Sequence, residues 1–87
     1  MVALIHTKGQ RSRVVNDPNL FRSKVFTLKF SNDTKILATG DQANNLTLFK
    51  IKNEVNLEQI FRIKHQKYVF TIDFSKDSSI LAVGDWA

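Results

Sequence analysis

An internal repeat constrains the fold of this 87-residue chain more than any other feature of its sequence. Residues 24–43 and 68–87 are identical at 12 of 20 aligned positions, and the second segment lies 44 residues after the first. Chance does not produce such a match, and a period of this length is typical of proteins built from repeated structural units. We therefore expect the two segments to fold alike.

Each copy of the repeat has the pattern of two β-strands joined by a turn. Residues 25–30 are rich in β-branched and aromatic side chains, and residues 36–40 form a short apolar run. Between them lie residues 31–34, Ser-Asn-Asp-Thr, whose side chains form hydrogen bonds to nearby backbone in turns. The same pattern predicts strands at 69–74 and 80–84 in the second copy.

The rest of the repeat unit predicts two further strands. Residues 46–50 alternate between apolar and polar and then run apolar, and residues 55–63 alternate between apolar and polar side chains as a half-buried strand does. The second segment also fits a helical face, because Leu57, Ile60 and Phe61 recur at helical spacing. We favour the strand, since the remainder of the unit predicts strands only.

A four-stranded unit with these residues resembles a WD40 repeat, the blade of a β-propeller. The resemblance is carried by residues 25–33, 36–40 and 46–50, and by His65, which lies four residues before Val69. It implies an all-β fold, a partial WD40-like β-propeller of antiparallel four-stranded blades with a 44-residue period. The implied domains are the last strands of a preceding blade with a basic loop (1–23), one full blade (24–67) and the first two strands of the next blade (68–87).

The same offset extends the repeat to the beginning of the sequence. Residues 2–5 align with residues 46–49, so we expect residues 1–6 and 11–15 to be the third and fourth strands of a preceding blade. On this interpretation the chain is a fragment that begins and ends within blades. Open strand edges beside large apolar side chains favour pairing with other chains, so we expect it to self-associate, aggregate or remain partly unfolded on its own.

The sequence departs from the family where WD40 repeats hold a polar network. Phe49-Lys50 stands at the Trp-Asp pair, Ala43 and Ala87 at the Asp of the turn, and Phe21 at the His position. Losing these partners together leaves no single buried polar group without a hydrogen bond. We therefore expect apolar packing to replace the network.

The first two strands of each unit carry apolar residues on both faces, which is typical of strands covered on both sides. We expect Phe30 and Phe74 to be buried, with Leu37 and Leu81 beside them. The structural repeat positions predicted from the sequence are Phe30, Asp33, Leu37, Gly40, Phe49, His65, Phe74, Asp77, Leu81 and Gly84.

Side chains suited to catalysis or metal binding occur without the partners that such chemistry needs. The chain has no Cys, which excludes disulfides, thiolate ligands and a Cys nucleophile. His65 has no second His at metal-ligand spacing. Asp33 and Asp77 occupy the same place in each copy, which indicates turn formers rather than an acid and base. We therefore predict no enzyme and no catalytic, cofactor or metal site.

Two further features bear on the location of the chain. No apolar stretch reaches the roughly 18 residues that span a bilayer, so we expect no membrane association. The absence of Cys fits a reducing intracellular compartment, cytoplasmic or nuclear.

The surface charge is concentrated at one end of the sequence. The net charge is +5, and residues 1–24 hold a net +4 of it. Such a basic segment can contact phosphates, but no aromatic residue interleaves residues 8–13, so base stacking has little support. The candidate interaction surface comprises Arg11, Arg13, Arg22, Lys24 and Trp86.

The family resemblance implies a non-catalytic scaffold that binds other proteins, whose identity the sequence leaves open. The basic segment supplies the alternative, a WD40 subunit of a nucleic-acid-associated assembly of the RNA-processing type. Nucleic acid is the less favoured partner.

Overall fold

A computed structural model describes residues 2–6, 11–15, 23–52 and 56–85, the first two ranges and Phe70 by their backbone only. The described residues form eight β-strands and no helix, which confirms the expected all-β class. The segment with two interpretations, 55–63, is a strand from Leu57 onward. The strands are β1 (Val2–His6), β2 (Arg11–Val15), β3 (Val25–Phe30), β4 (Ile36–Asp41), β5 (Asn45–Ile51), β6 (Leu57–Lys64), β7 (Val69–Phe74) and β8 (Leu81–Asp85).

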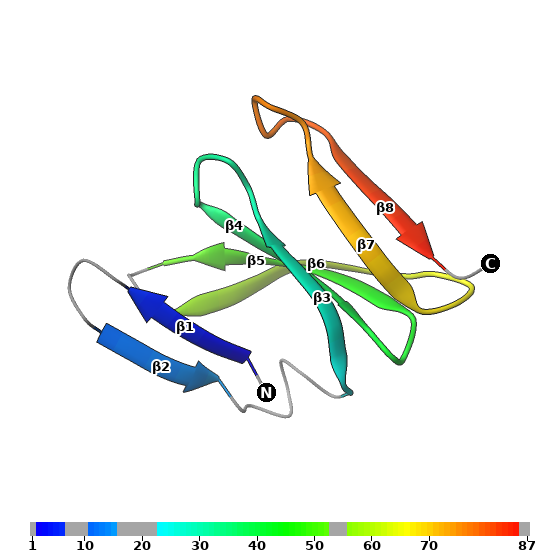
Figure 1. Cartoon of the computed structure of the whole chain (residues 1–87), viewed down its shortest axis with the longest axis horizontal. Coiled ribbons are helices and arrows are strands. Elements are labelled where there is room, and N and C mark those ends of the chain that lie inside the picture. The colour runs from blue at the N-terminus through cyan, green and yellow to red at the C-terminus, as the bar shows by residue number, and fades with distance from the viewer. Residues whose placement is uncertain (1, 7–10, 16–22, 53–55, 86–87) are drawn as a thin grey trace.

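The strands form three antiparallel sheets (Figure 1). Strands β3, β4, β5 and β6 make a four-stranded sheet in which each strand pairs with the next along the chain. The β1–β2 and β7–β8 hairpins are two-stranded, and the four-stranded sheet lies between them (Figure 1). Short turns between consecutive antiparallel strands produce this order directly.

The two copies of the repeat fold into equivalent hairpins. In both, the first strand contains a register shift after its first residue, and its last four residues pair without a gap. A bulge at this point bends the strand and increases its twist. Equivalent pairs are Phe30 with Leu37 and Phe74 with Leu81, and likewise Thr27 with Gly40 and Thr71 with Gly84.

The turns of the two hairpins are also equivalent. The backbone N–H of Ser31 donates to Ile36 O at 2.8 Å, and that of Ser75 donates to Ile80 O at 2.8 Å. Thr34 adopts a φ of 59°, and its counterpart Ser78 a φ of 65°. The Thr34 hydroxyl donates to Asp33 O at 2.6 Å, and the Ser78 hydroxyl accepts from the backbone N–H of Asn32 at 2.8 Å.

The β7–β8 hairpin packs on one face of the four-stranded sheet. Its Val69 and Ile72 form a buried cluster with Ala38 of β4 and Leu46 of β5. Gly40 permits this approach, because a Cβ at that position would lie 2.4 Å from Cγ1 of Val69 and 2.7 Å from its carbonyl oxygen. The second hairpin is therefore seated on the sheet at a position where only glycine fits.

The opposite face of the sheet contains the largest buried side chain, Phe49, which pairs with Leu37. Both are 0% exposed. Beside them Thr47 is buried and accepts a hydrogen bond from Nε of Arg62 at 2.9 Å. Apolar packing therefore surrounds Phe49, and the hydroxyl of neighbouring Thr47 has a hydrogen-bond partner.

The prediction that Phe30 is buried is wrong, and that for its counterpart Phe74 is only partly met. Phe30 is 41% exposed, while Phe74 and Leu81 are half-buried. Leu37 is fully buried as expected. Phe30 lies on β3, at the edge of the sheet, on the face opposite to the β7–β8 hairpin. The strand itself was predicted correctly, but burial depends on a neighbouring element over that face.

Candidate functional site

One end of the sheets gathers three connecting segments: residues 23–24 before β3, the β4–β5 turn at 42–44, and the β6–β7 connection at 65–68 (Figure 1). We call this the loop end. Backbone hydrogen bonds hold the segments together, from Gln42 N to Lys24 O at 2.9 Å and from His65 N to Asn44 O at 2.7 Å. Loops held by a sheet in this way are common positions for binding residues.

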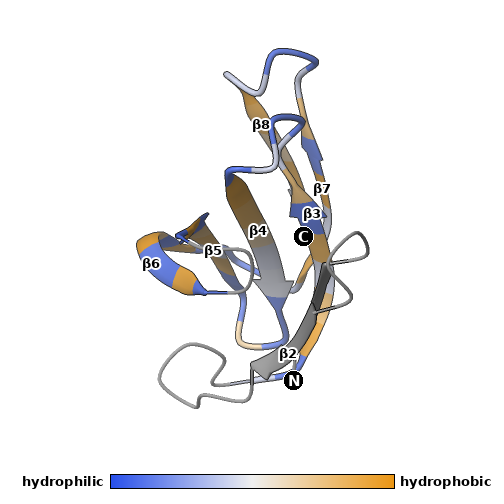
Figure 2. Cartoon of the chain, turned by 90° about the vertical axis from the view of Figure 1, so that its left-hand side faces the viewer, coloured by the Kyte–Doolittle hydropathy of each residue, from blue (hydrophilic) through white to orange (hydrophobic). Residues whose placement is uncertain are grey.

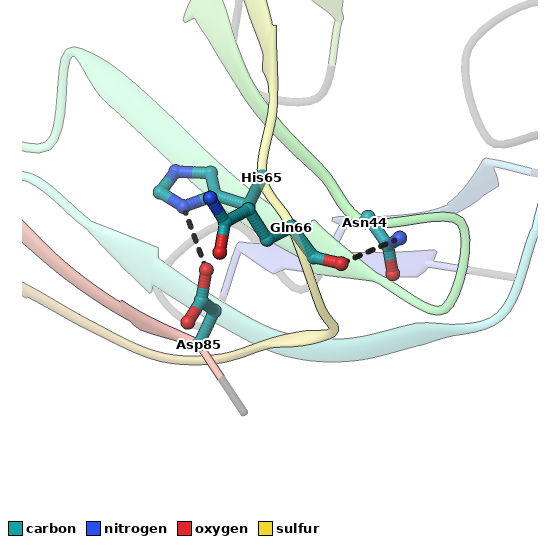
Figure 3. Close-up of polar contacts among 4 residues, drawn as sticks. All are labelled: Asn44, His65, Gln66 and Asp85. Carbon is teal, nitrogen blue, oxygen red and sulfur yellow. Dashed lines mark hydrogen bonds and ion pairs between the residues drawn. The ribbon is translucent and has the colours of Figure 1, made fainter. Parts of the chain in front are cut away.

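A contact between two polar side chains links the loop end to the second hairpin. Nδ1 of His65 lies 3.3 Å from Oδ2 of Asp85, the last residue of β8. A carboxylate oxygen accepts hydrogen bonds, and the imidazole donates in this contact in the tautomer that carries its proton on Nδ1. Figure 3 shows this contact and, beside it, the Asn44 side chain that donates to Gln66 O at 3.4 Å. Together these contacts tie the β6–β7 connection to β8 and to the β4–β5 turn.

Sequence reasoning did not anticipate the pairing of His65 with Asp85. The resemblance to WD40 repeats led us to expect the acidic partner of the His at Ala87, a position that lies outside the described residues. The sequence contained one signal for Asp85, namely that an acidic residue recurs there at the 44-residue offset from Asp41. Asp41 has a different role, since its Oδ1 accepts from Asn45 N at 2.9 Å within its own turn.

Two aromatic side chains form an exposed pair at the loop end. Phe26 is 48% exposed and Tyr68 is 41% exposed. Their ring centroids lie 5.4 Å apart with an interplanar angle of 76°, an edge-to-face arrangement that aromatic rings favour. Phe26 lies at the bulge of β3, where Val25 and Thr27 both pair with β4 but Phe26 does not. The bulge sets this side chain apart from the regular faces of the sheet.

The other end of the sheets contains the β3–β4 and β7–β8 turns, and we call it the turn end. Asn32 joins the two turns, because its backbone N–H donates to Oγ of Ser78 at 2.8 Å and its side chain donates to the carbonyl oxygens of Ser75 and Lys76. The repeat does not predict this contact, since Lys76 replaces Asn32 in the second copy.

The two repeated carboxylates lie in these turns and accept hydrogen bonds there. The Ser31 hydroxyl and the Lys35 N–H lower the pKa of Asp33 below its ordinary value. The hydroxyl and N–H of Ser79, together with the hydroxyl of Ser75, lower the pKa of Asp77 to about 2. Both groups are therefore ionised at neutral pH and serve as acceptors for the turn backbone.

The described residues do not test the interaction surface predicted from the sequence. Lys24 is exposed at the loop end. Arg11 and Arg13 lie on β2, where the backbone alone is described, and Arg22 and Trp86 lie outside the described residues. The interaction surface predicted from these five residues therefore stays a prediction.

The repeat positions predicted from the sequence fall into three structural classes. Turn or loop positions are Asp33, Asp77 and His65; strand positions are Phe30, Leu37, Phe49, Phe74 and Leu81; close-approach glycines are Gly40 and Gly84. In the described part of the chain, no group of three or more His, Cys, Asp or Glu residues is placed to hold a metal ion. That part also contains no helix long and apolar enough to cross a membrane.

Comparison with known proteins finds no matching family model, no matching curated protein and no matching solved structure. The interpretation of the fold and of its function therefore rests on the repeat, the pairing of the strands and the contacts described above.

Proposed function

We propose that the chain is part of a WD40-like β-propeller and that it acts as a non-catalytic scaffold for binding other proteins. The observation that carries the propeller proposal is the stacking of equivalent units. The β7–β8 hairpin repeats the register of β3–β4 and packs face to face with the four-stranded sheet through Val69 and Gly40. Four-stranded sheets stacked in this way around an axis are the blades of a propeller.

The loop end supports the binding proposal. An exposed aromatic pair, Phe26 and Tyr68, lies beside connections held by hydrogen bonds. Exposed aromatic side chains on a rigid frame are suited to protein binding, because they supply a large contact area at a low cost in conformational entropy. We propose this pair as the anchor for a protein partner, in addition to the surface predicted at Trp86 and Lys24.

The test is partner capture by the tagged chain and by two matched variants. Replacing Phe26 and Tyr68 with Ala should abolish capture. Ile80→Ala should leave it unchanged, because Ile80 is 68% exposed but lies at the turn end. Equal loss in both variants, or no loss in either, would rule out the loop end as the binding surface.

A second function is favoured by the net charge of +4 in residues 1–24, namely binding within a nucleic-acid-associated assembly. Nuclease treatment before capture separates the two proposals, since a protein scaffold retains its partner. Replacing Arg11, Arg13 and Arg22 with Gln tests the alternative directly. If nucleic acid is the partner, this variant binds single-stranded RNA more weakly and with a flatter salt dependence. The scaffold proposal predicts no appreciable RNA binding at physiological salt by either protein.

A further inference from the structure

Three exposed lysines lie at the loop end together with the aromatic pair. Lys24 precedes Phe26 by two residues, and Lys67 is adjacent to Tyr68 in the chain. Because Phe26 and Tyr68 are in contact, these two lysines are brought to one place from distant segments. Lys64, the last residue of β6, adds a third positive charge at the same end. All three lysine side chains are exposed.

No exposed carboxylate offsets these lysines among the described residues of the loop end. Asp41 is 7% exposed and accepts a hydrogen bond from Asn45 N. Asp85 is half-buried, and its carboxylate contacts His65. The exposed surface beside the aromatic pair is therefore positively charged.

The turn end differs from the loop end in its charge. Lys35 and Lys76 are exposed there beside Asp33 and Asp77, which are exposed and ionised at neutral pH. Figure 2 shows the β3–β4 and β7–β8 turns, at the top of the view, as mainly hydrophilic. Ile80 at this end is 68% exposed, more than either ring of the aromatic pair. Exposure of apolar side chains therefore does not distinguish the two ends, whereas the sign of the surrounding charge does.

We propose that the loop end binds an acidic peptide segment that carries one bulky apolar residue. This inference rests on the scaffold function proposed above, with Phe26 and Tyr68 as the anchor, and adds the chemistry of the partner. The apolar side chain of the peptide packs against the two rings, and its flanking carboxylates lie against Lys24, Lys64 and Lys67. Opposite charge steers the peptide to this end of the molecule, and the apolar contact adds short-range affinity.

The geometry of the aromatic pair favours a peptide over a single-stranded nucleic acid. Successive bases bind proteins by stacking on aromatic rings whose faces are open. In the edge-to-face arrangement of Phe26 and Tyr68, with an interplanar angle of 76°, the edge of one ring lies against the face of the other. The two rings therefore form an apolar corner rather than parallel platforms for bases.

The charge of the chain also disfavours a second copy of itself as the occupant. The net charge is +5, and two loop ends that face each other would bring the lysines of both copies together. Like charges opposed across an interface weaken association. A partner with surplus carboxylates removes this repulsion.

Fluorescence anisotropy with synthetic peptides tests the proposal on the full chain at pH 7. The probe is a fluorescein-labelled peptide of sequence Glu-Glu-Glu-Leu-Glu-Glu-Glu, and two comparison peptides replace its Glu residues with Lys or its Leu with Ala. We expect the lysine peptide to bind at least about tenfold more weakly than the probe, because its charge repels the loop end. The alanine peptide should bind about 3- to 10-fold more weakly, since it lacks the apolar side chain. Affinity for the probe should fall as the salt concentration rises.

Matched lysine variants locate the contact. A chain with Lys24→Gln and Lys67→Gln should bind the probe about 3- to 10-fold more weakly, because two exposed ion pairs are lost. The control chain carries Lys35→Gln and Lys76→Gln, which remove the same charge from exposed positions at the turn end. It should bind the probe within about twofold of the unmodified chain, since charges farther apart than the screening length interact weakly. Circular dichroism of each chain checks that the strands are retained.

A charge reversal gives a gain of binding. A chain with Lys24→Glu and Lys67→Glu should bind the lysine peptide more tightly than the unmodified chain does, because the new carboxylates attract it. Unchanged or weaker binding of the lysine peptide would contradict a direct role for these two positions.

The remaining outcomes separate this inference from the proposed function. Replacing Phe26 and Tyr68 with Ala removes the anchor on which both depend. If this variant loses the probe but the Lys24 and Lys67 variant binds as tightly as the turn-end control, the anchor stands and the acidic partner is overturned. If neither variant loses the probe, the loop end is not the binding surface and both proposals fail. Equal binding of the acidic and lysine peptides, no binding of either, or tighter binding of a uridine oligonucleotide than of the probe also overturns the inference.

Discussion

The β3–β4 and β7–β8 hairpins have closely similar sequences, the same register and the same turn, yet they bury their side chains differently. Ala38 and Leu37 on β4 are 0% exposed, while Ala82 on β8 is exposed and Leu81 is half-buried. Strand β4 has β5 at its side and β7 against one face, whereas β8 pairs with β7 alone among the described residues. The comparison shows that local sequence determines the hairpin and that neighbouring elements determine burial.

The largest expected effect is the removal of the buried leucine from the first hairpin. Leu37→Ala should lower the free energy of unfolding by about 2–5 kcal/mol, because it removes a fully buried side chain and leaves a cavity. Leu81→Ala, at the equivalent but half-buried position, should cost clearly less. Urea unfolding of both variants at one fixed protein concentration makes the measurement. Equal costs would contradict the difference in burial between the hairpins.

A smaller effect is expected from adding a methyl group at the repeated glycine. Gly40→Ala should cost about 1–3 kcal/mol, because the new Cβ meets the side chain and backbone of Val69. Gly84→Ala is the matched control. Its Cβ would meet only Cγ2 of the exposed Thr71, at 2.6 Å, and that side chain can move aside. If thermal unfolding shows that Gly84→Ala destabilises the chain more than Gly40→Ala, the close packing at Gly40 is contradicted.

The smallest expected effect is the loss of folding stability at low pH, when the carboxylates of Asp33 and Asp77 become protonated. Asp33 and Asp77 both have lowered pKa values in the folded chain, so the stability that they contribute is present above their ordinary pKa of 3.8. It is lost as the pH falls, and the loss from Asp77 extends down to about pH 2. Both groups are exposed, so the change should be modest.

Asn substitutions compare the two turns. The urea midpoint should fall less between pH 4 and pH 2 in Asp77→Asn than in the unmodified chain, since the titrating group has been removed. Asp33→Asn should have an effect in the same direction. An Asp77→Asn variant with the full acid dependence would show that this turn does not depend on the ionised carboxylate.

The features that the sequence predicted are those that depend on neighbours in the chain. The strands, the turns around Asp33 and Asp77, and the choice of strand over helix at 57–64 follow from residue type and spacing. Phe26, Gly40 and Val69 also lie within or beside the repeated segments. The contacts of Phe26 with Tyr68 and of Gly40 with Val69, however, join positions far apart in the chain.

The features that the sequence did not predict depend on elements far apart in the chain. The exposure of Phe30 depends on whether another element covers the edge strand β3. The residue types along the strand do not show this. The pairing of His65 with Asp85 joins positions 20 residues apart through the placement of β8, and Asn32 reaches across to a turn more than 40 residues later. None of these contacts has a counterpart in the other copy from which it could be inferred.

The central claim is that the second hairpin stacks on the first sheet where Gly40 meets Val69, and a double-mutant cycle tests it most directly. Gly40→Ala is measured by urea unfolding in the unmodified chain and in a Val69→Ala background, at one fixed protein concentration. Val69→Ala removes the Cγ1 atom that lies closest to the new methyl group. The account predicts that Gly40→Ala costs less in the Val69→Ala background, with a coupling energy of about 0.5–3 kcal/mol. Costs that add to within about 0.5 kcal/mol would contradict the stacking of the two hairpins.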